Sequence, residues 1–149
     1  YTPAEIKSVF AHELGHHVYQ HIWKMLAIGT VSGFFGFAFC HLVLTKVIVV
    51  LGYQNIHDIA AFPAVCIALA VSGFILLPIQ NAISRRFERA CDKYAIEKTN
   101  DPDAFISTME KLAEQNLADR TPNRVVELLF YSHPPISKRI EMAKEHVQL

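Results

Sequence analysis

Charged residues are missing from two long stretches in the middle of the chain. Residues 25–45 and 59–83 contain no Asp, Glu, Lys or Arg. A helix needs about 20 consecutive apolar residues to cross the hydrocarbon core of a bilayer, and each stretch is long enough. The alternative is a buried hairpin in a soluble core, where two such stretches separated by a short turn are rare. The sequence therefore predicts a transmembrane helical hairpin over about residues 25–83. Its turn region is predicted at residues 46–58, with an extension of the first span through Val47 to Leu51 as the alternative.

Further absences limit the function classes. Fourteen basic and fourteen acidic side chains leave no net charge, so nothing favours a nucleic-acid partner. The three cysteines form no CxxC pair, and their odd number argues against a disulfide framework, so we expect all three to be reduced. The chain begins at Tyr1 without a basic-then-apolar leader, and we expect it to be a piece of a longer protein.

A five-residue HExxH motif, residues 12–16, carries residue types suited to metal chemistry. On a helix, His12 and His16 lie four residues apart on one face, so both imidazoles can reach one metal ion. Glu13 is turned aside from them and lies beside that ion, where its carboxylate can take a proton from a water that zinc activates. The alternative interpretation is an amphipathic helix that happens to carry histidines.

The HExxH motif lies in a predicted helix. Thr2 as N-cap, Pro3 at the first position and Glu5 three residues after the cap form a helix start. The helix is predicted to continue through the motif to about Lys24. Gly15 in its interior costs about 1 kcal/mol relative to alanine, so we expect another segment to pack closely against the helix there.

The other histidines have weaker signals. His17 and His21 are also four residues apart, but no carboxylate follows His17, so this pair would bind a metal without a general base. For His41, His57 and His146 we expect structural or solvent-exposed roles.

A polar stripe follows the second apolar stretch. Asn81, Ser84, Glu88 and Asp92 recur at helical spacing and share one face of a helix that leaves the membrane. A chain that crosses the bilayer and returns brings its outer ends to the same side, so this stripe can meet His16. Glu88 is our choice for the third metal ligand. Asp92, one turn further on, is placed to fix a ligating imidazole or to hold an arginine. Ser84 is interpreted as a polar residue that is only solvated.

Two more helices are predicted after the stripe. Asp101 as N-cap and Pro102 begin a helix to about Asp119, whose buried side we expect to contain Phe105, Met109, Leu112 and Leu117. The short apolar segment 125–130 fits a helix or a strand, because its periodicity does not separate the two. A last charged helix is predicted from Ile136 to about Val147.

His133 lies in the rigid sequence Ser132-His133-Pro134-Pro135, just before the last helix. An imidazole held there can donate a hydrogen bond to the oxyanion that forms when water adds to a peptide carbonyl. The alternative is a surface histidine in a turn.

Basic residues lie mainly outside the predicted hairpin. Its connecting loop contains only Lys46, whereas its outer ends are flanked by Lys7, Lys24, Arg85, Arg86, Arg89 and Lys93. By the positive-inside rule, the HExxH motif is predicted to face the cytoplasm. A bacterial inner membrane and an endoplasmic reticulum membrane both satisfy this orientation.

Three motifs in this order, HELGH, NAISRRFERACD and SHPPISKRI, resemble the integral-membrane zinc metallopeptidases that include the type I CaaX prenyl proteases and the HtpX heat-shock proteases. The resemblance covers nearly the whole chain. It implies a mostly α-helical, zincin-like domain of the gluzincin type over residues 1–149, with the membrane hairpin inserted in it. It also implies one Zn²⁺ ion per chain and an endopeptidase that hydrolyses polypeptide substrates.

The resemblance also implies roles for single residues. It assigns zinc binding to His12, His16 and Glu88, catalysis to Glu13, support of the site to Asp92, transition-state stabilisation to His133, an ion pair to Arg139 and a substrate-backbone contact to Asn81. Cys91 stands where the family usually has alanine, and we expect little effect from this difference.

The sequences SRRFE and SHPP are closer to the CaaX-protease branch, which implies a prenylated C-terminal CaaX peptide as substrate and contact with membrane lipid. An HtpX-like protease for membrane-protein quality control is the alternative. A non-catalytic membrane scaffold with a closed zinc shell is the alternative of another class. An intramembrane protease would need an Asp ligand within a span, and the predicted spans contain no acidic residue.

Overall fold

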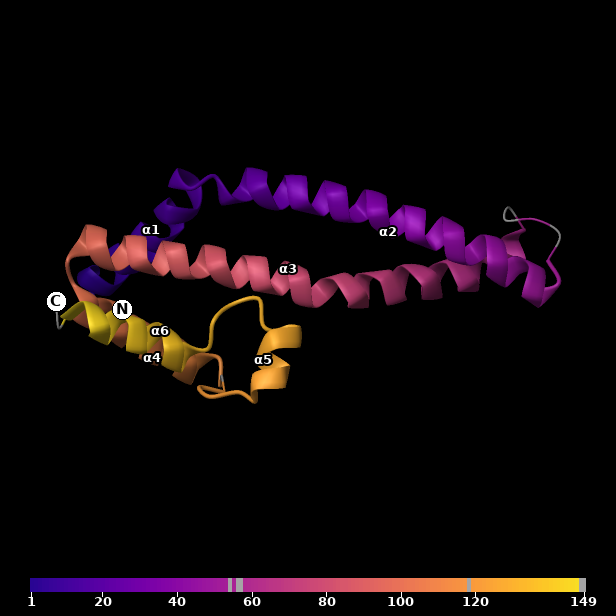
Figure 1. Cartoon of the computed structure of the whole chain (residues 1–149). Helices are drawn as coiled ribbons and strands as arrows, with labels where there is room; N and C mark the ends of the chain where they lie inside the picture. The colour runs from indigo at the N-terminus through magenta and orange to yellow at the C-terminus, as the bar shows by residue number, and fades with distance from the viewer. Residues whose placement is uncertain (54, 56–57, 118, 148–149) are drawn as a thin grey trace. The chain divides into compact units, whose positions relative to one another are not determined.

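The structure is a computed structural model that describes residues 1–53, 55, 58–117 and 119–147. These residues are mostly α-helical and include no strand, which confirms the predicted fold class. The elements in chain order are α1 (Pro3–Val18), α2 (His21–Leu51), the 3-10 helix η1 (Ile59–Ala61), α3 (Phe62–Thr99), α4 (Pro102–Gln115), α5 (Arg124–Phe130) and α6 (Ile136–Val147) (Figure 1).

The chain divides into two compact units. Unit 1 consists of residues 1–22 and 79–149, and unit 2 consists of residues 23–78. Helices α2 and α3 each contribute to both units, because the unit boundaries lie inside them.

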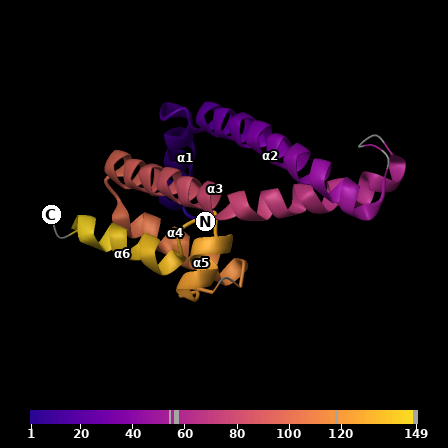
Figure 2. The same cartoon turned by 45° about the vertical axis from the view of Figure 1, so that its right-hand side comes forward.

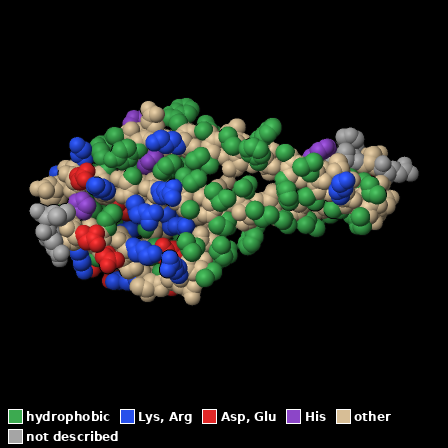
Figure 3. Space-filling view, in the orientation of Figure 1, with side chains coloured by type: hydrophobic (Ala, Val, Ile, Leu, Met, Phe, Trp, Pro, Cys, Tyr) green, Lys and Arg blue, Asp and Glu red, His purple; other side chains and the backbone are tan. Residues whose placement is uncertain are grey.

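Unit 2 contains most of the predicted membrane hairpin, up to Pro78. Helices α2 and α3 are both long and apolar enough to cross a membrane, by length and composition. Together with η1, they pack through a small core of Cys40, Leu44, Ile48, Ala61 and Ala68. Most of the other large apolar side chains of unit 2 are exposed, and hydrophobic side chains dominate its visible surface (Figure 3). An apolar exterior over a small core suits helices that are surrounded by lipid.

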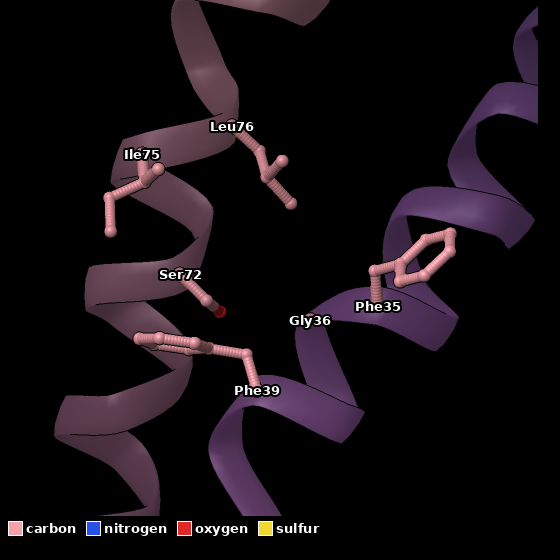
Figure 4. A pocket seen from close by; sticks show the side chains of 6 residues that line it. All are labelled: Phe35, Gly36, Phe39, Ser72, Ile75 and Leu76. Atoms are coloured by element: carbon pink, nitrogen blue, oxygen red, sulfur yellow. The ribbon is translucent and has the colours of Figure 1, made fainter. Parts of the chain in front are cut away.

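A cavity of about 210 Å³ lies between α2 and α3 within unit 2 (Figure 4). It is lined by Phe35, Gly36, Phe39, Ser72, Ile75 and Leu76. Its hydroxyl group, on Ser72, donates a hydrogen bond of 2.8 Å to the carbonyl of Leu69 one turn earlier. The cavity is therefore apolar and has no titratable lining residue, and the polar chemistry of the chain lies in unit 1.

The start of α1 is as predicted. The Thr2 hydroxyl accepts a hydrogen bond from the Glu5 backbone, and the Glu5 carboxylate accepts one from the Thr2 backbone, so the two residues form a capping box. The same carboxylate accepts hydrogen bonds from Ser107 and Lys111 of α4. The first turn of the helix that carries the HExxH motif is thus fixed to α4.

The end of α1 differs from the prediction. The helix ends at Val18, and α2 begins at His21, so a continuous helix to Lys24 is wrong. Gln20 adopts a left-handed backbone conformation with φ of 55°, and its N–H donates to the carbonyl of His17. A left-handed residue stops a right-handed helix, and neither glycine nor proline marks this position in the sequence.

Helix α1 packs closely against the C-terminal part of α3 in unit 1. A Cβ atom built on Gly15 would lie 3.2 Å from both Cα and Sγ of Cys91. Close packing at Gly15 is therefore confirmed, and the absence of a side chain there lets the two backbones approach. This approach brings the HExxH face of α1 against the polar stripe of α3.

Helices α4 and α6 lie side by side in both views (Figures 1 and 2). The core that they share with α1 and α3 contains Ala11, Ala95, Ile96, Phe105, Met109 and Ala143. Asp101 caps α4 as predicted, with Pro102 in the first turn. Charged side chains gather over the visible face of unit 1 (Figure 3).

Helix α4 ends at Gln115, so the predicted end at about Asp119 is wrong. Leu117 has a left-handed backbone with φ of 48° and a side chain that is 93% exposed, so its predicted burial is also wrong. The next position of the apolar repeat is Asn116, whose amide donates to the carbonyl of Leu112. The apolar face of α4 therefore ends before Leu117.

The remaining predictions have mixed outcomes. Residues 125–130 are helical, as part of α5, and α6 has the predicted bounds. Four residues with predictions lie outside the described residues. They are Ala118 of the predicted α4 extension and residues 54, 56 and 57 of the predicted turn region, of which residue 57 is His57. All three cysteines are free.

Candidate active site

Helices α1 and α3 bring three potential metal ligands together in unit 1. The Nε2 atoms of His12 and His16 are 3.3 Å apart. A carboxylate oxygen of Glu88 lies 3.3 Å from Nε2 of His12, and the other lies 3.4 Å from Nε2 of His16. Ligands about 2.0–2.1 Å from a tetrahedral zinc ion are separated by roughly 3.3 Å. The donor types and their spacing therefore fit one zinc ion.

Asp92 and Arg139 form a buried ion pair behind His12. The Asp92 side chain has no exposed surface, and one of its oxygens lies 2.9 Å from Nδ1 of His12. Arg139, on α6, donates from Nε to one oxygen of Asp92 at 2.8 Å and from Nη2 to the other. Asp92 thus engages the ring nitrogen of His12 that faces away from Glu88, and Arg139 compensates its buried charge.

The two carboxylates set the electrostatics around His12. Burial by itself would lower the pKa of His12, but the contacts with Asp92 and Glu88 outweigh it and raise the pKa to about 9. The negative charge of these two carboxylates favours a cation beside the imidazoles, and a metal ion that binds His12 displaces its proton, because only the neutral ring is a ligand.

A cavity of about 180 Å³ opens beside these residues. It is lined by Ser8, Val9, His12, Glu13, Glu88, Phe105, Thr108, Met109, Leu112, His133 and Arg139. Glu13 is exposed and borders the cavity next to His12. The predicted general base and two of the predicted ligands therefore face the same small space, which is suited to a reacting group.

His133 approaches the same cavity from the segment before α6. Its side chain is 60% exposed, and its Nε2 lies 3.5 Å from a carboxylate oxygen of Glu88. Its Nδ1 lies 2.9 Å from the hydroxyl of Ser132. The imidazole is thus at the rim of the cavity, between Glu88 and solvent.

Asn81 and Arg85 connect α3 to the segment before His133. Asn81 donates to the carbonyl of Leu129 at 2.8 Å. Arg85 is buried and donates to the carbonyls of Glu127 and Tyr131. The predicted polar stripe does not include Arg85, so no role in the site is predicted for it. A cation at the C-terminal end of α5 is favoured by the helix dipole, but the partner helix is not visible in the local sequence.

His21 was also missed as a partner of the site. Its Nδ1 lies 3.2 Å from Nδ1 of His16 and 3.4 Å from Sγ of Cys91. His17, its predicted partner in a rival pair, is exposed, and no potential metal-binding group found among the described residues includes His17. The left-handed Gln20 directs His21 towards His16, and this conformation has no signal in the local sequence.

A helical fold with an HExxH pair and a glutamate returned from another helix is typical of a metal-dependent peptidase. The chain belongs to peptidase family M48, which matches residues 1–147. The resemblance to membrane metallopeptidases is therefore confirmed at the level of the family.

Several curated proteins are similar to this chain. An uncharacterised metalloprotease, YhfN of Bacillus subtilis, is 30% identical over 95% of this chain and 34% of its own length. A human CAAX prenyl protease 1 homologue is 28% identical over 94% of this chain and 30% of its own length. The protease HtpX of Pseudomonas savastanoi is 28% identical over 95% of this chain and 52% of its own length. The chain thus spans about a third to a half of these relatives.

Proposed function

We propose that this protein is a zinc-dependent endopeptidase of the membrane, with one zinc ion held by His12, His16 and Glu88. The observation that carries the proposal is the mutual spacing of their donor atoms, 3.3 to 3.4 Å. Two histidines and one carboxylate leave a fourth position open in a tetrahedral site, as catalytic zinc requires. When bound, zinc supplies Lewis acidity, which lowers the pKa of water and polarises a carbonyl group.

Glu13 is the general base in this proposal. It follows His12 directly, so it is turned about 100° around the helix from that ligand, and it borders the same cavity. Its carboxylate takes a proton from the attacking water and passes it to the amine that leaves when the peptide bond breaks. The nucleophile and the leaving group therefore exchange their proton through one side chain.

The remaining residues orient a zinc ligand and the substrate, and they stabilise the oxyanion. Asp92, held by Arg139, keeps the His12 ring in the orientation that directs Nε2 towards Glu88. His133, at the rim of the cavity, donates a hydrogen bond to the oxyanion that develops on the attacked carbonyl. Asn81 contacts the substrate backbone in this proposal, and its hydrogen bond to the Leu129 carbonyl ties it to the segment that precedes His133.

The proposed domain organisation is a single metallopeptidase domain over residues 1–149 with a membrane hairpin, about residues 25–83, inside it. The make-up of unit 1 supports this organisation, because residues 1–22 and 79–149 form one compact unit although an inserted segment separates them in the sequence. The basic residues that flank the hairpin support a cytoplasmic active site, in a bacterial inner membrane or in the endoplasmic reticulum.

The proposed substrate is a polypeptide with a prenylated C-terminal CaaX sequence, and the hairpin contacts lipid. Similarity to a human protein named CAAX prenyl protease 1 homologue supports this choice. Similarity to proteins named HtpX favours the second candidate, a membrane-protein quality-control protease that accepts unprenylated chains. A zinc-binding scaffold without activity is the candidate of another class, and the position of Glu13 on the cavity argues against it.

The test uses the full-length protein in detergent. Cleavage of a farnesylated CaaX peptide is compared with cleavage of an unprenylated unfolded polypeptide, with Glu13→Gln as the blank. Selective cleavage of the farnesylated peptide supports CaaX processing, whereas equal cleavage of both supports quality control. Glu13→Gln should keep its zinc and lose turnover, and Glu88→Ala should lose zinc. A Glu88→Ala variant with full zinc content and activity would refute the proposed site.

A further inference from the structure

We propose that His21 is a positioning residue for the metal site. Its imidazole accepts a hydrogen bond from Nδ1 of His16 and thereby fixes the orientation of that ligand. This inference rests on the proposed zinc site. It concerns a residue outside the HExxH motif and outside the ligand set.

The two nitrogens of the His16 ring face different partners. Nε2 faces His12 and Glu88, at 3.3 and 3.4 Å. Nδ1 faces Nδ1 of His21 at 3.2 Å, and the ring centroids are 5.1 Å apart. A ligating Nε2 must carry a lone pair, so the ring proton of neutral His16 is on Nδ1. His16 therefore donates to His21, whose own proton is then on its Nε2.

The position of the acceptor is well defined. The His21 side chain is buried and stacks on Phe87, with ring centroids 4.2 Å apart and planes only 10° from parallel. Cys91 Sγ lies 3.4 Å from the same Nδ1 atom. Phe87 and Cys91 flank the ligand Glu88 on α3, so the acceptor is held by the same helix that supplies the third ligand. A fixed acceptor restricts the rotation of the His16 ring.

The break between α1 and α2 is what makes this contact possible. In a continuous helix, residues five apart lie about 140° apart around the axis and cannot face each other. The left-handed Gln20 redirects the chain, so that His21 turns back towards His16. A strained backbone at a residue that is neither glycine nor asparagine is then connected to a specific contact at the metal site.

Each ligating histidine thus has a partner of its own. His12 has the carboxylate of Asp92 at its Nδ1, and His16 has the neutral imidazole of His21 at its Nδ1. Partners of this kind orient metal ligands, and their removal typically lowers metal affinity by about 10- to 100-fold. We expect an effect of this size for His21.

The first experiment measures zinc affinity by competition with a chromophoric chelator, using the full-length protein in detergent. His21→Phe keeps the stacking on Phe87 but removes the acceptor, and it should weaken zinc binding about 10- to 100-fold. His21→Asn provides an amide oxygen as acceptor and should bind more tightly than His21→Phe. His17→Phe makes the same chemical change at an exposed position of α1 and should bind like the wild type. Wild-type affinity in His21→Phe would overturn the inference.

A second measurement needs no variant. In the zinc-loaded wild type with ¹⁵N-labelled histidine, NMR should show His16 protonated at Nδ1 and His21 protonated at Nε2. Protonation of His21 at Nδ1 would contradict the inference. In the cobalt-substituted protein, a thiolate-to-cobalt charge-transfer band would also contradict it, because His16, His21 and Cys91 would then hold the metal themselves. Failure of the wild type to bind zinc would instead refute the proposed function.

Discussion

Arg139 donates two hydrogen bonds to the carboxylate of Asp92, and Asp92 is completely buried behind the proposed ligand His12. The pair joins α6 to α3, whereas the motif histidines lie on α1. Three segments that are distant in the sequence thus meet at one carboxylate. Removal of the partner costs more stability for a buried charge than for an exposed one, and the first prediction follows from this difference.

Arg139→Met should destabilise the fold strongly. It leaves the buried carboxylate of Asp92 with His12 as its remaining charged partner, and removal of one partner of a buried pair costs about 3–5 kcal/mol. Adding Asp92→Asn should recover part of this loss, because the buried negative charge is then gone. Arg120→Met, in an exposed pair with Glu114 at 3.8 Å, is the control and should cost less than about 1 kcal/mol.

The measurement for this pair is unfolding of each variant in detergent with a metal chelator present, so that metal binding does not contribute. If Arg139→Met is as stable as Arg120→Met, the pair does not compensate a buried charge.

Gly15→Ala should destabilise the packing of α1 on α3. The new Cβ would lie 3.2 Å from the backbone Cα of Cys91, which cannot move aside as a side chain can. Overpacking of this kind costs about 1–3 kcal/mol. The zinc affinity should fall as well, because α1 must move away from α3 to make room for the methyl group, which separates His12 and His16 from Glu88.

The control for Gly15 is Gly29→Ala, since nothing lies within 4 Å of a Cβ at Gly29 in α2. Thermal unfolding and chelator competition give both readouts. A stabilised Gly15→Ala variant with unchanged zinc affinity would show that α3 adjusts to the new methyl group.

Much of the fold could be predicted from local patterns. The capping box at Thr2 and the proline at the start of α4 use local chemistry, and both helices begin where predicted. Helical spacing alone also placed His12 and His16 on one face, and Glu88 on the polar stripe of α3. Local rules work here because each feature depends on residues within one or two turns.

The unpredicted features depend on two unusual backbone conformations and on distant contacts. Gln20 and Leu117 both have positive φ, which residues of their types rarely adopt, and neither position itself holds the glycine or asparagine that usually takes this conformation. His21 faces His16 only because of the first turn, and Arg85 is buried only because the end of α5 lies against it. Contacts between residues more than 40 positions apart, such as Arg85 with Tyr131, leave no periodic signal in the sequence.

Arg85→Met should lower turnover without removing the metal. The guanidinium group donates to the carbonyls of Glu127 and Tyr131, and these bonds fix the segment that leads to His133. If His133 stabilises the oxyanion, its own loss should reduce kcat by about 10²–10³. Arg85→Met should reduce kcat by no more than His133→Ala, and the double variant should resemble His133→Ala.

The control for Arg85 is Arg86→Met, which changes an exposed arginine on the same helix. Zinc content and steady-state kinetics are measured on each variant. Additive losses in the double variant would show that Arg85 acts independently of His133.

Stability should depend on pH through Glu5. Hydrogen bonds from Lys111, Ser107 and the Thr2 backbone lower the pKa of Glu5 from about 4.5 to about 2, although burial opposes the shift. A carboxylate whose pKa is lower in the folded state stabilises the fold above its unfolded pKa. This contribution is therefore complete above about pH 4.5 and is lost as the pH falls towards 2.

Glu5→Gln keeps the size of the side chain but removes its charge, so it should lower the melting temperature near pH 6. The difference from the wild type should shrink as the pH falls from 4.5 to 2, because the wild type then loses the same interaction. Glu110→Gln makes the same change at an exposed position of α4 and should have little effect at any pH. Melting curves of the three proteins over this pH range test the link between α1 and α4. A constant difference between wild type and Glu5→Gln would mean that Glu5 acts through its shape and not through its charge.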